Sequence, residues 1–148
     1  MGRLGIGVES EKITDLHFER SSISRSDMKL EETPMHLEAS RQLEEYFSGR
    51  RKIFDLPLAP KGTDFQMRCW EALLKVPYGE TRSYGDIARS VGSPRGFRAV
   101  GMANNRNPIS IIIPCHRIIG SDGKLVGFGG GLDIKEFLLG LERKYAKS

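Results

Sequence analysis

Cysteine, histidine and long apolar runs are all scarce in this sequence, and each shortage excludes a class of protein. Two cysteines and three histidines, with no Cys-x-x-Cys pair, provide no zinc-ligand spacing, so we expect neither a metal nor a cofactor. No apolar run approaches the ~20 residues of a membrane-spanning helix. Residues 1–6 lack the apolar block of a signal peptide, so we expect a cytoplasmic protein whose cysteines stay reduced.

Acidic residues are missing from Ile87 to Ser121, although the chain as a whole carries a net charge of +4. Residues 1–60 contain nine Lys and Arg against eleven Asp and Glu, whereas residues 61–148 contain fourteen against eight. The acid-free stretch also holds five arginines, which are Arg89, Arg95, Arg98, Arg106 and Arg117. Such a run is often just a solvated face, but the lack of any compensating acid favours a polyanionic partner, with nucleic acid as the leading candidate.

The domain organisation follows from a segment rich in proline and glycine, residues 56–63, which we interpret as a linker. Before it, alternating apolar residues over 4–8 and 13–18 predict a β-hairpin, and a proline begins a predicted helix over 34–48. The buried side of this helix is predicted to consist of Leu37, Leu43, Tyr46 and Phe47. We therefore expect a small α/β domain over residues 1–58, with no evident chemistry of its own.

Helices dominate the second predicted domain, residues 63–148. The sequence predicts a helix over 65–75, a short helix over 84–91 capped by Ser83 and, after a Gly-Ser-Pro break, another over 95–104. The last two have the dimensions of a helix-turn-helix, a DNA-binding unit, although other helical hairpins look similar. The predicted helix over 95–104 carries small residues that suit close approach to DNA or tight packing against another helix: Ala99, Gly101 and Ala103.

Cys115 lies between two isoleucine-rich stretches, directly after Pro114 and before His116 and Arg117. A thiol is nucleophilic as the thiolate, and basic neighbours lower a cysteine pKa, so this run indicates a reactive site. The alternative is an inert core residue, because free cysteine is among the most buried residue types. Two basic neighbours argue against a role in packing alone. Cys69, on the apolar side of the helix over 65–75, is predicted to be a core residue.

The run Asn107 to Ile119, with Pro114-Cys115-His116-Arg117 at its centre, resembles the signature of the O6-alkylguanine-DNA alkyltransferases. Arg98-Ala99-Val100-Gly101 before it and Gly130-Gly131-Leu132 after it extend the likeness over residues 63–143, whereas residues 1–60 resemble the family only loosely. The resemblance implies an α+β fold, in which a small ribonuclease H-like α/β domain precedes a mainly helical, winged helix-turn-helix-like domain. It also implies a monomer that repairs double-stranded DNA containing O6-alkylguanine, without an obligate protein partner.

The resemblance assigns roles to residues of the reaction centre. Cys115 would take the alkyl group irreversibly, His116 would remove the thiol proton through a bound water, and Glu142 would orient and charge the imidazole. Asn107 would hold the turn that aims the thiol. Tyr84 would help to turn out the nucleotide and would donate a hydrogen bond to guanine as negative charge develops on its ring.

The resemblance also implies a DNA surface and a substrate pocket. Arg98 would fill the gap left by the flipped base, in the minor groove. The other residues expected to contact DNA are Ser83, Tyr84, Arg95, Ala99 and Gly101. Backbone groups at Cys115, Ile118, Gly129 and Gly130 would read the guanine edge, and Lys135 would steady the glycine loop.

Departures from the family pattern bear on the range of substrates. Ser110 and Gly129 stand where some members carry proline and serine, and Phe128 replaces a tyrosine, which puts acceptance of bulky alkyl groups in question. Activity on O4-alkylthymine is left open. Two other functions also stay open, a DNA-binding module without transfer and a Cys–His hydrolase. The hydrolase is disfavoured because the sequence lacks an oxyanion-loop signature.

Overall fold

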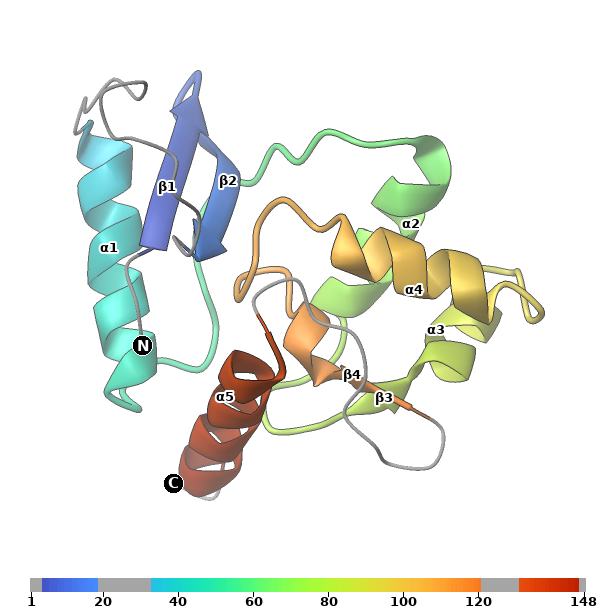
Figure 1. Ribbon diagram of the computed structural model, residues 1–148. Helices are drawn as coiled ribbons and strands as arrows, with labels where there is room; N and C mark the ends of the chain where they lie inside the picture. Colours follow the sequence, from blue (N-terminus) through green and yellow to red (C-terminus); the bar gives the residue numbers. More distant parts are fainter. Residues whose placement is uncertain (1–3, 19–32, 121–130, 147–148) are drawn as a thin grey trace.

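The computed structural model describes residues 4–18, 33–120 and 131–146, which form an α+β fold (Figure 1). The N-terminal part is an antiparallel hairpin beside one helix: β1 (Leu4–Glu9), β2 (Lys12–Phe18) and α1 (Pro34–Phe47). The C-terminal part contains four helices within the described ranges: α2 (Asp64–Leu74), α3 (Tyr84–Ser90), α4 (Phe97–Asn105) and α5 (Leu132–Tyr145). Two short strands, β3 (Arg82–Ser83) and β4 (Ile118–Ile119), pair in parallel. None of the described helices is long and apolar enough to cross a membrane.

Helix α1 begins and ends close to the predicted residues. Thr33 caps it, since the Thr33 hydroxyl accepts from the backbone N–H of His36 at 3.3 Å, and Pro34 occupies the first turn. The prediction that Leu37 is buried was wrong, because this side chain is 58% exposed. Leu37 lies two residues before Ala39, about 200° around the helix, so it points away from the side that covers the hairpin.

The predicted linker is part of the fold rather than a spacer. Ile13 of β2 donates its N–H to Pro57 at 2.9 Å and accepts from the N–H of Ala59 at 2.7 Å. Further along the same strand, Leu16 donates to Pro108 at 2.8 Å, and its carbonyl accepts from Ser110 at 2.9 Å. The edge of β2 that is not paired with β1 is therefore covered by the linker and by the chain just before Cys115. One hydrophobic core runs through both parts.

Helices α3 and α4 form the predicted helix-turn-helix, and both pack against α2. Ser83 caps α3, because its hydroxyl accepts from the Asp86 N–H at 3.0 Å and its own N–H donates to the Asp86 carboxylate at 2.9 Å. Trp70 of α2 donates its indole N–H to the carbonyl of Ala103 on α4, at 2.9 Å. The turn between α3 and α4 contains Gly92 at φ +77°, a conformation that favours glycine.

Candidate active site

Cys115 begins a single 3₁₀ turn, Cys115–Arg117, and the residue is only 4% exposed. The chain reaches this turn through Ile111, which adopts φ +73°, a costly conformation for a β-branched residue. Asn107 holds the strained segment from both sides. Its amide Nδ2 donates to the Ile113 carbonyl at 2.8 Å, and its Oδ1 accepts from the Ile109 N–H at 2.9 Å. Asn107 thus fixes the backbone that positions the thiol.

The environment of Cys115 differs from the one its sequence neighbours predict. Burial raises the pKa of the Cys115 thiol to about 11, against the influence of a hydrogen bond from Asn107 and the charge of Lys135. The predicted lowering of this pKa by the side chains of His116 and Arg117 was wrong, because burial outweighs every lowering effect and because His116 Nε2 and Arg117 Nε bind Glu142. Cys115 is therefore a protonated thiol at neutral pH, and it needs a base to become a nucleophile.

His116 forms a buried pair with Glu142 of α5. The imidazole Nε2 donates to Glu142 Oε2 at 2.6 Å, since the carboxylate can only accept. Burial lowers the pKa of His116 more than Glu142 raises it, so the ring is neutral near pH 7. The other ring nitrogen, Nδ1, is buried and makes no hydrogen bond to any described residue. Its lone pair is free to accept a proton.

Glu142 is the hub of the hydrogen-bond network and is 1% exposed. Burial acts to raise the pKa of its carboxyl, but hydrogen bonds from His116 and Arg117 outweigh burial and hold the pKa at about 2. Arg117 donates from Nε to Oε1 at 2.8 Å and from a terminal nitrogen to Oε2 at 2.9 Å. Tyr46 donates to Oε2 at 2.7 Å, and the Gly79 N–H to Oε1 at 3.3 Å. The carboxylate is ionised throughout the working pH range.

Arg117 does not belong to a DNA-binding face, contrary to the prediction for the acid-free stretch. It is buried, it neutralises Glu142, and its remaining terminal nitrogen donates to the Val76 carbonyl at 2.8 Å. Arg89 is exposed but forms an ion pair with Asp86, which lies just before the stretch. Arg95, Arg98 and Arg106 are exposed on or beside α4. The cationic surface therefore centres on α4.

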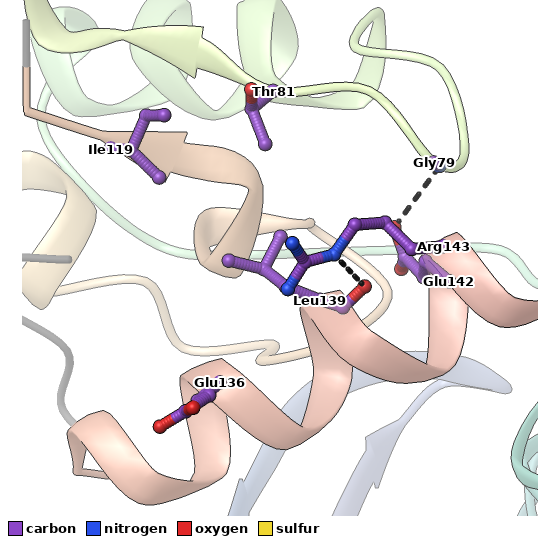
Figure 2. Close-up of a pocket in the computed structure, with 7 residues that line it drawn as sticks. All are labelled: Gly79, Thr81, Ile119, Glu136, Leu139, Glu142 and Arg143. Atoms are coloured by element: carbon purple, nitrogen blue, oxygen red, sulfur yellow. Dashed lines mark hydrogen bonds between the residues drawn. The ribbon is translucent and has the colours of Figure 1, made fainter. Parts of the chain in front are cut away.

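A pocket of about 360 Å³ lies where α5 faces the loop before β3 (Figure 2). Figure 2 shows Glu142 joined to the Gly79 backbone on one side of it and Arg143 to the Leu139 carbonyl on another. Its lining residues are Gly79, Thr81, Ile119, Glu136, Leu139, Glu142 and Arg143. Glu142 is among them and Cys115 is not, so this pocket adjoins the Glu142 carboxylate rather than the thiol.

Lys135 of α5 is fully buried, and its ammonium donates to the carbonyl of Ile118. Burial lowers the pKa of Lys135 to about 8, although the nearby Cys115 acts to raise it. Lys135 therefore supplies positive charge close to the sulfur, a role that sequence reasoning missed. The predicted glycine loop, Gly129 and Gly130, lies outside the described residues, as does Phe128.

Tyr84, the first residue of α3, faces the same region. Burial and the charge of Cys115 raise the pKa of its phenol, while a hydrogen bond with Asn104 acts to lower it. Asn104 also donates from Nδ2 to the Cys115 carbonyl at 3.3 Å, so it joins the two groups. Sequence reasoning did not single out Asn104. A signal was present, because an amide on the core-facing side of α4 has to be hydrogen-bonded.

The residues expected to contact DNA gather on the α3–α4 unit. Arg95, Arg98 and Ala99 are exposed, whereas Ser83 and Gly101 are half-buried. The small residues of α4 serve two purposes. Ala103 is in the core and permits close packing of α4, whereas a Cβ at Gly101 would make only an ordinary contact, 3.8 Å from the Tyr84 ring. Ala99 and the 65% exposed Met102 face outward.

Fold and site together define a protein that combines a helix-turn-helix with a buried cysteine and an adjacent His–Glu pair. Two family models match the chain, described as "6-O-methylguanine DNA methyltransferase, ribonuclease-like domain" over residues 1–60 and "6-O-methylguanine DNA methyltransferase, DNA binding domain" over residues 64–144. The chain belongs to this family. The resemblance drawn from the motif around Cys115 and the α+β fold class are confirmed.

Several relatives are similar over most of the chain. The methylated-DNA–protein-cysteine methyltransferase of Methanosarcina barkeri is 70% identical over 105 residues, 71% of this chain and 66% of the relative. The constitutive enzyme of Bacillus subtilis is 48% identical over 151 residues, 97% of this chain and 90% of its own. These names confirm the predicted activity class, an S-methyltransferase that acts on methylated DNA.

Solved structures agree with the fold. The crystal structure of Mycobacterium tuberculosis O6-methylguanine methyltransferase has a TM-score of 0.87 at 46% identity, and the match covers 97% of this chain and 88% of that one. The same organism's protein in complex with DNA has a TM-score of 0.87 at 47% identity, over 96% of this chain and 87% of that one.

Proposed function

We propose that this chain repairs DNA by moving an alkyl group, in the first place methyl, from O6-alkylguanine in duplex DNA onto Cys115. The observation that carries the proposal is the buried thiol beside a neutral His116 whose Nε2 is bound to the ionised Glu142. Such a pair leaves Nδ1 as a base, and a buried thiol with a raised pKa needs one.

The transfer is a displacement at the alkyl carbon. The thiol proton passes through a water to His116 Nδ1, the sulfur–carbon bond forms, and the bond between carbon and O6 breaks with guanine as the leaving group. Tyr84 donates a hydrogen bond to the base as negative charge develops on it. Lys135 and Asn107 favour the thiolate, because both act to lower the Cys115 pKa. No group in the described site can cleave the resulting thioether, so each molecule acts once.

The thiol is buried, so the alkylated base has to leave the duplex to reach it. Arg98 occupies the gap in the stack, while Tyr84 crowds the phosphate of the extruded nucleotide. Ser83, Arg95, Ala99 and Gly101 contact the DNA around this point, in the minor groove. Ile118 and the glycines at 129 and 130 read the base edge. We also propose that the protein is a monomer, acts in the cytoplasm and needs no obligate protein partner.

Methyl transfer to the protein tests the proposal directly. After incubation with a duplex that contains O6-methylguanine, we expect one methyl group per chain, located on the peptide with Cys115 by mass spectrometry. Cys69→Ala is the matched control and should still accept one methyl group, because Cys69 is a core residue of α2. Methyl uptake by Cys115→Ala would contradict the proposal. Tight binding of the damaged duplex with Cys115 left unmodified would instead indicate a recognition module.

A further inference from the structure

Tyr46 belongs to α1, in the part of the chain matched by the ribonuclease-like domain, yet its hydroxyl reaches the His116–Glu142 pair. The Tyr46 O–H donates to Glu142 Oε2 at 2.7 Å, and the same oxygen accepts from His116 Nε2 at 2.6 Å. Burial and the negative charge of Glu142 raise the pKa of the Tyr46 phenol, so the hydroxyl keeps its proton and acts as a donor. Residues 1–58, whose sequence shows no evident chemistry, therefore contribute a hydrogen bond to the site.

The direction of this hydroxyl is fixed by aromatic packing. Tyr46 is fully buried, and its ring centroid lies 5.4 Å from that of Phe47, 5.3 Å from Phe54 and 6.2 Å from Tyr78. Two of these contacts are edge-to-face, the arrangement that aromatic pairs favour. The ring cannot turn without disrupting the core, so the hydroxyl is held against the carboxylate.

Three donors share Glu142 Oε2: the imidazole of His116, a terminal nitrogen of Arg117 at 2.9 Å, and the hydroxyl of Tyr46. Arg117 and Tyr46 each take some of the negative charge of Oε2 that would otherwise stabilise a protonated imidazole at His116. Among the described residues, the groups nearest to His116, apart from Tyr46 of α1, come from two elements. Glu142 and Lys135 belong to α5, whereas Arg117 and Cys115 share its own turn. Tyr46 acts on His116 through Glu142.

We propose that Tyr46 is a positioning residue for alkyl transfer, whose hydroxyl fixes the Glu142 carboxylate and, by drawing charge from Oε2, sets how strong a base His116 is. The inference rests on the proposed function for the role of His116 as the base. The N-terminal part of the chain therefore contributes a side chain to the reaction centre. The hydrogen bond made by one ring nitrogen of a histidine determines the state of the other nitrogen, so a group that orients the acceptor also acts on the imidazole.

The test compares Tyr46→Phe with Tyr78→Phe. Tyr78 is the matched control, because its ring packs beside Tyr46 while its hydroxyl makes no hydrogen bond to the described residues. The measurement is the first-order rate of methyl transfer from an O6-methylguanine duplex between about pH 5 and about pH 9. In Tyr46→Phe, Glu142 keeps more negative charge and the His116 pKa rises. The acidic limb of the curve of transfer rate against pH therefore moves about half a pH unit upward. Tyr78→Phe should follow the wild type.

A second measurement separates this inference from the proposed function. Nitrogen NMR of labelled histidine follows the titration of His116 without DNA, and Tyr46→Phe should raise its midpoint. If the wild type transfers no methyl group, the proposed function fails, while the titration still decides the role of Tyr46. Fluorotyrosine at position 46 is a stronger hydrogen-bond donor of similar shape. It should shift the His116 titration midpoint downward, and it leaves no cavity where the hydroxyl was. Coincident titrations for wild type, Tyr46→Phe and fluorotyrosine, or an equal shift in Tyr78→Phe, would overturn the inference.

Discussion

The pKa of the Cys115 thiol is set mainly by burial and by side chains from other parts of the sequence. Its neighbours His116 and Arg117 turn away to bind Glu142, whereas Asn107 and Lys135 act to lower the thiol pKa. A thiol with a pKa of about 11 is almost wholly protonated at neutral pH, which protects it from indiscriminate alkylation. Activation then depends on the base and on a positive charge inside the core.

Lys135→Met tests this charge. The change keeps the length of the side chain but removes the cation near the sulfur, so the Cys115 pKa should rise above its present value of about 11. We expect methyl transfer at saturating duplex to slow by about 10-fold to 1000-fold, because a nearby opposite charge shifts a pKa by about one to three units. Lys144→Met, at an exposed position of the same helix, is the control. Equal rates in the two variants would exclude a role for the Lys135 charge.

At the scale of elements, α4 presents a buried side and an exposed side, to which the proposal assigns different functions. Val100, Ala103 and Asn104 face the core and the active site, whereas Arg98, Ala99 and Met102 face outward. The helix-turn-helix therefore holds the reaction centre and the proposed DNA surface on one rigid unit. The position of Arg98 relative to the thiol is fixed by α4 rather than by a flexible loop.

Arg98→Ala should separate base extrusion from chemistry. Without the side chain that fills the stack, repair of a duplex should fall by at least about 10-fold, since extrusion costs a few kcal/mol. Reaction with free O6-methylguanine should be unchanged, because no stack has to be filled. Arg106→Ala, at the other end of α4, controls for the loss of one exposed charge, and in both proteins binding should weaken with added salt. Equal losses of rate on duplex and on free base would rule out this role for Arg98.

For the whole molecule, Glu142 joins parts that are far apart along the chain. It accepts hydrogen bonds from α1, from the loop before β3 and from the turn that begins at Cys115. The hairpin strand β2 adds backbone bonds to Pro57 and Ser110. Because these contacts and the core are shared, we expect the two parts to depend on each other for stability.

Acid should unfold this protein through the same network. The Glu142 pKa is about 2 in the folded chain against an ordinary 4.5, so its contribution is complete above pH 4.5 and is lost as the pH falls towards 2. The shift corresponds to about 3 kcal/mol. His116, whose pKa is lowered from 6.5, adds a loss that begins as the pH falls below that value. Stability therefore declines from about pH 6.5 downward.

Glu142→Gln should remove the part of this decline between pH 4.5 and 2, and it should destabilise the protein by about 3–5 kcal/mol at neutral pH, because Arg117 loses its counter-charge. Urea denaturation at several pH values measures both effects. Glu136→Gln, at an exposed position of α5, should leave the curve unchanged. An unaltered acid decline in Glu142→Gln would show that other groups cause it.

The amino-acid sequence by itself determined helices α1 to α4, the cap of α3, the helix-turn-helix and the family, because caps, turns and apolar periodicity are local patterns. Ser83 caps the helix that its position predicts, and the run around Cys115 identifies the family. Only the tertiary structure decided the electrostatics of the site. Tyr46 meets Glu142 across 96 positions, and Lys135 reaches the region of Cys115 from another helix. A pKa depends on burial and on distances in space, and adjacency in sequence, as for Arg117 and Cys115, specifies neither.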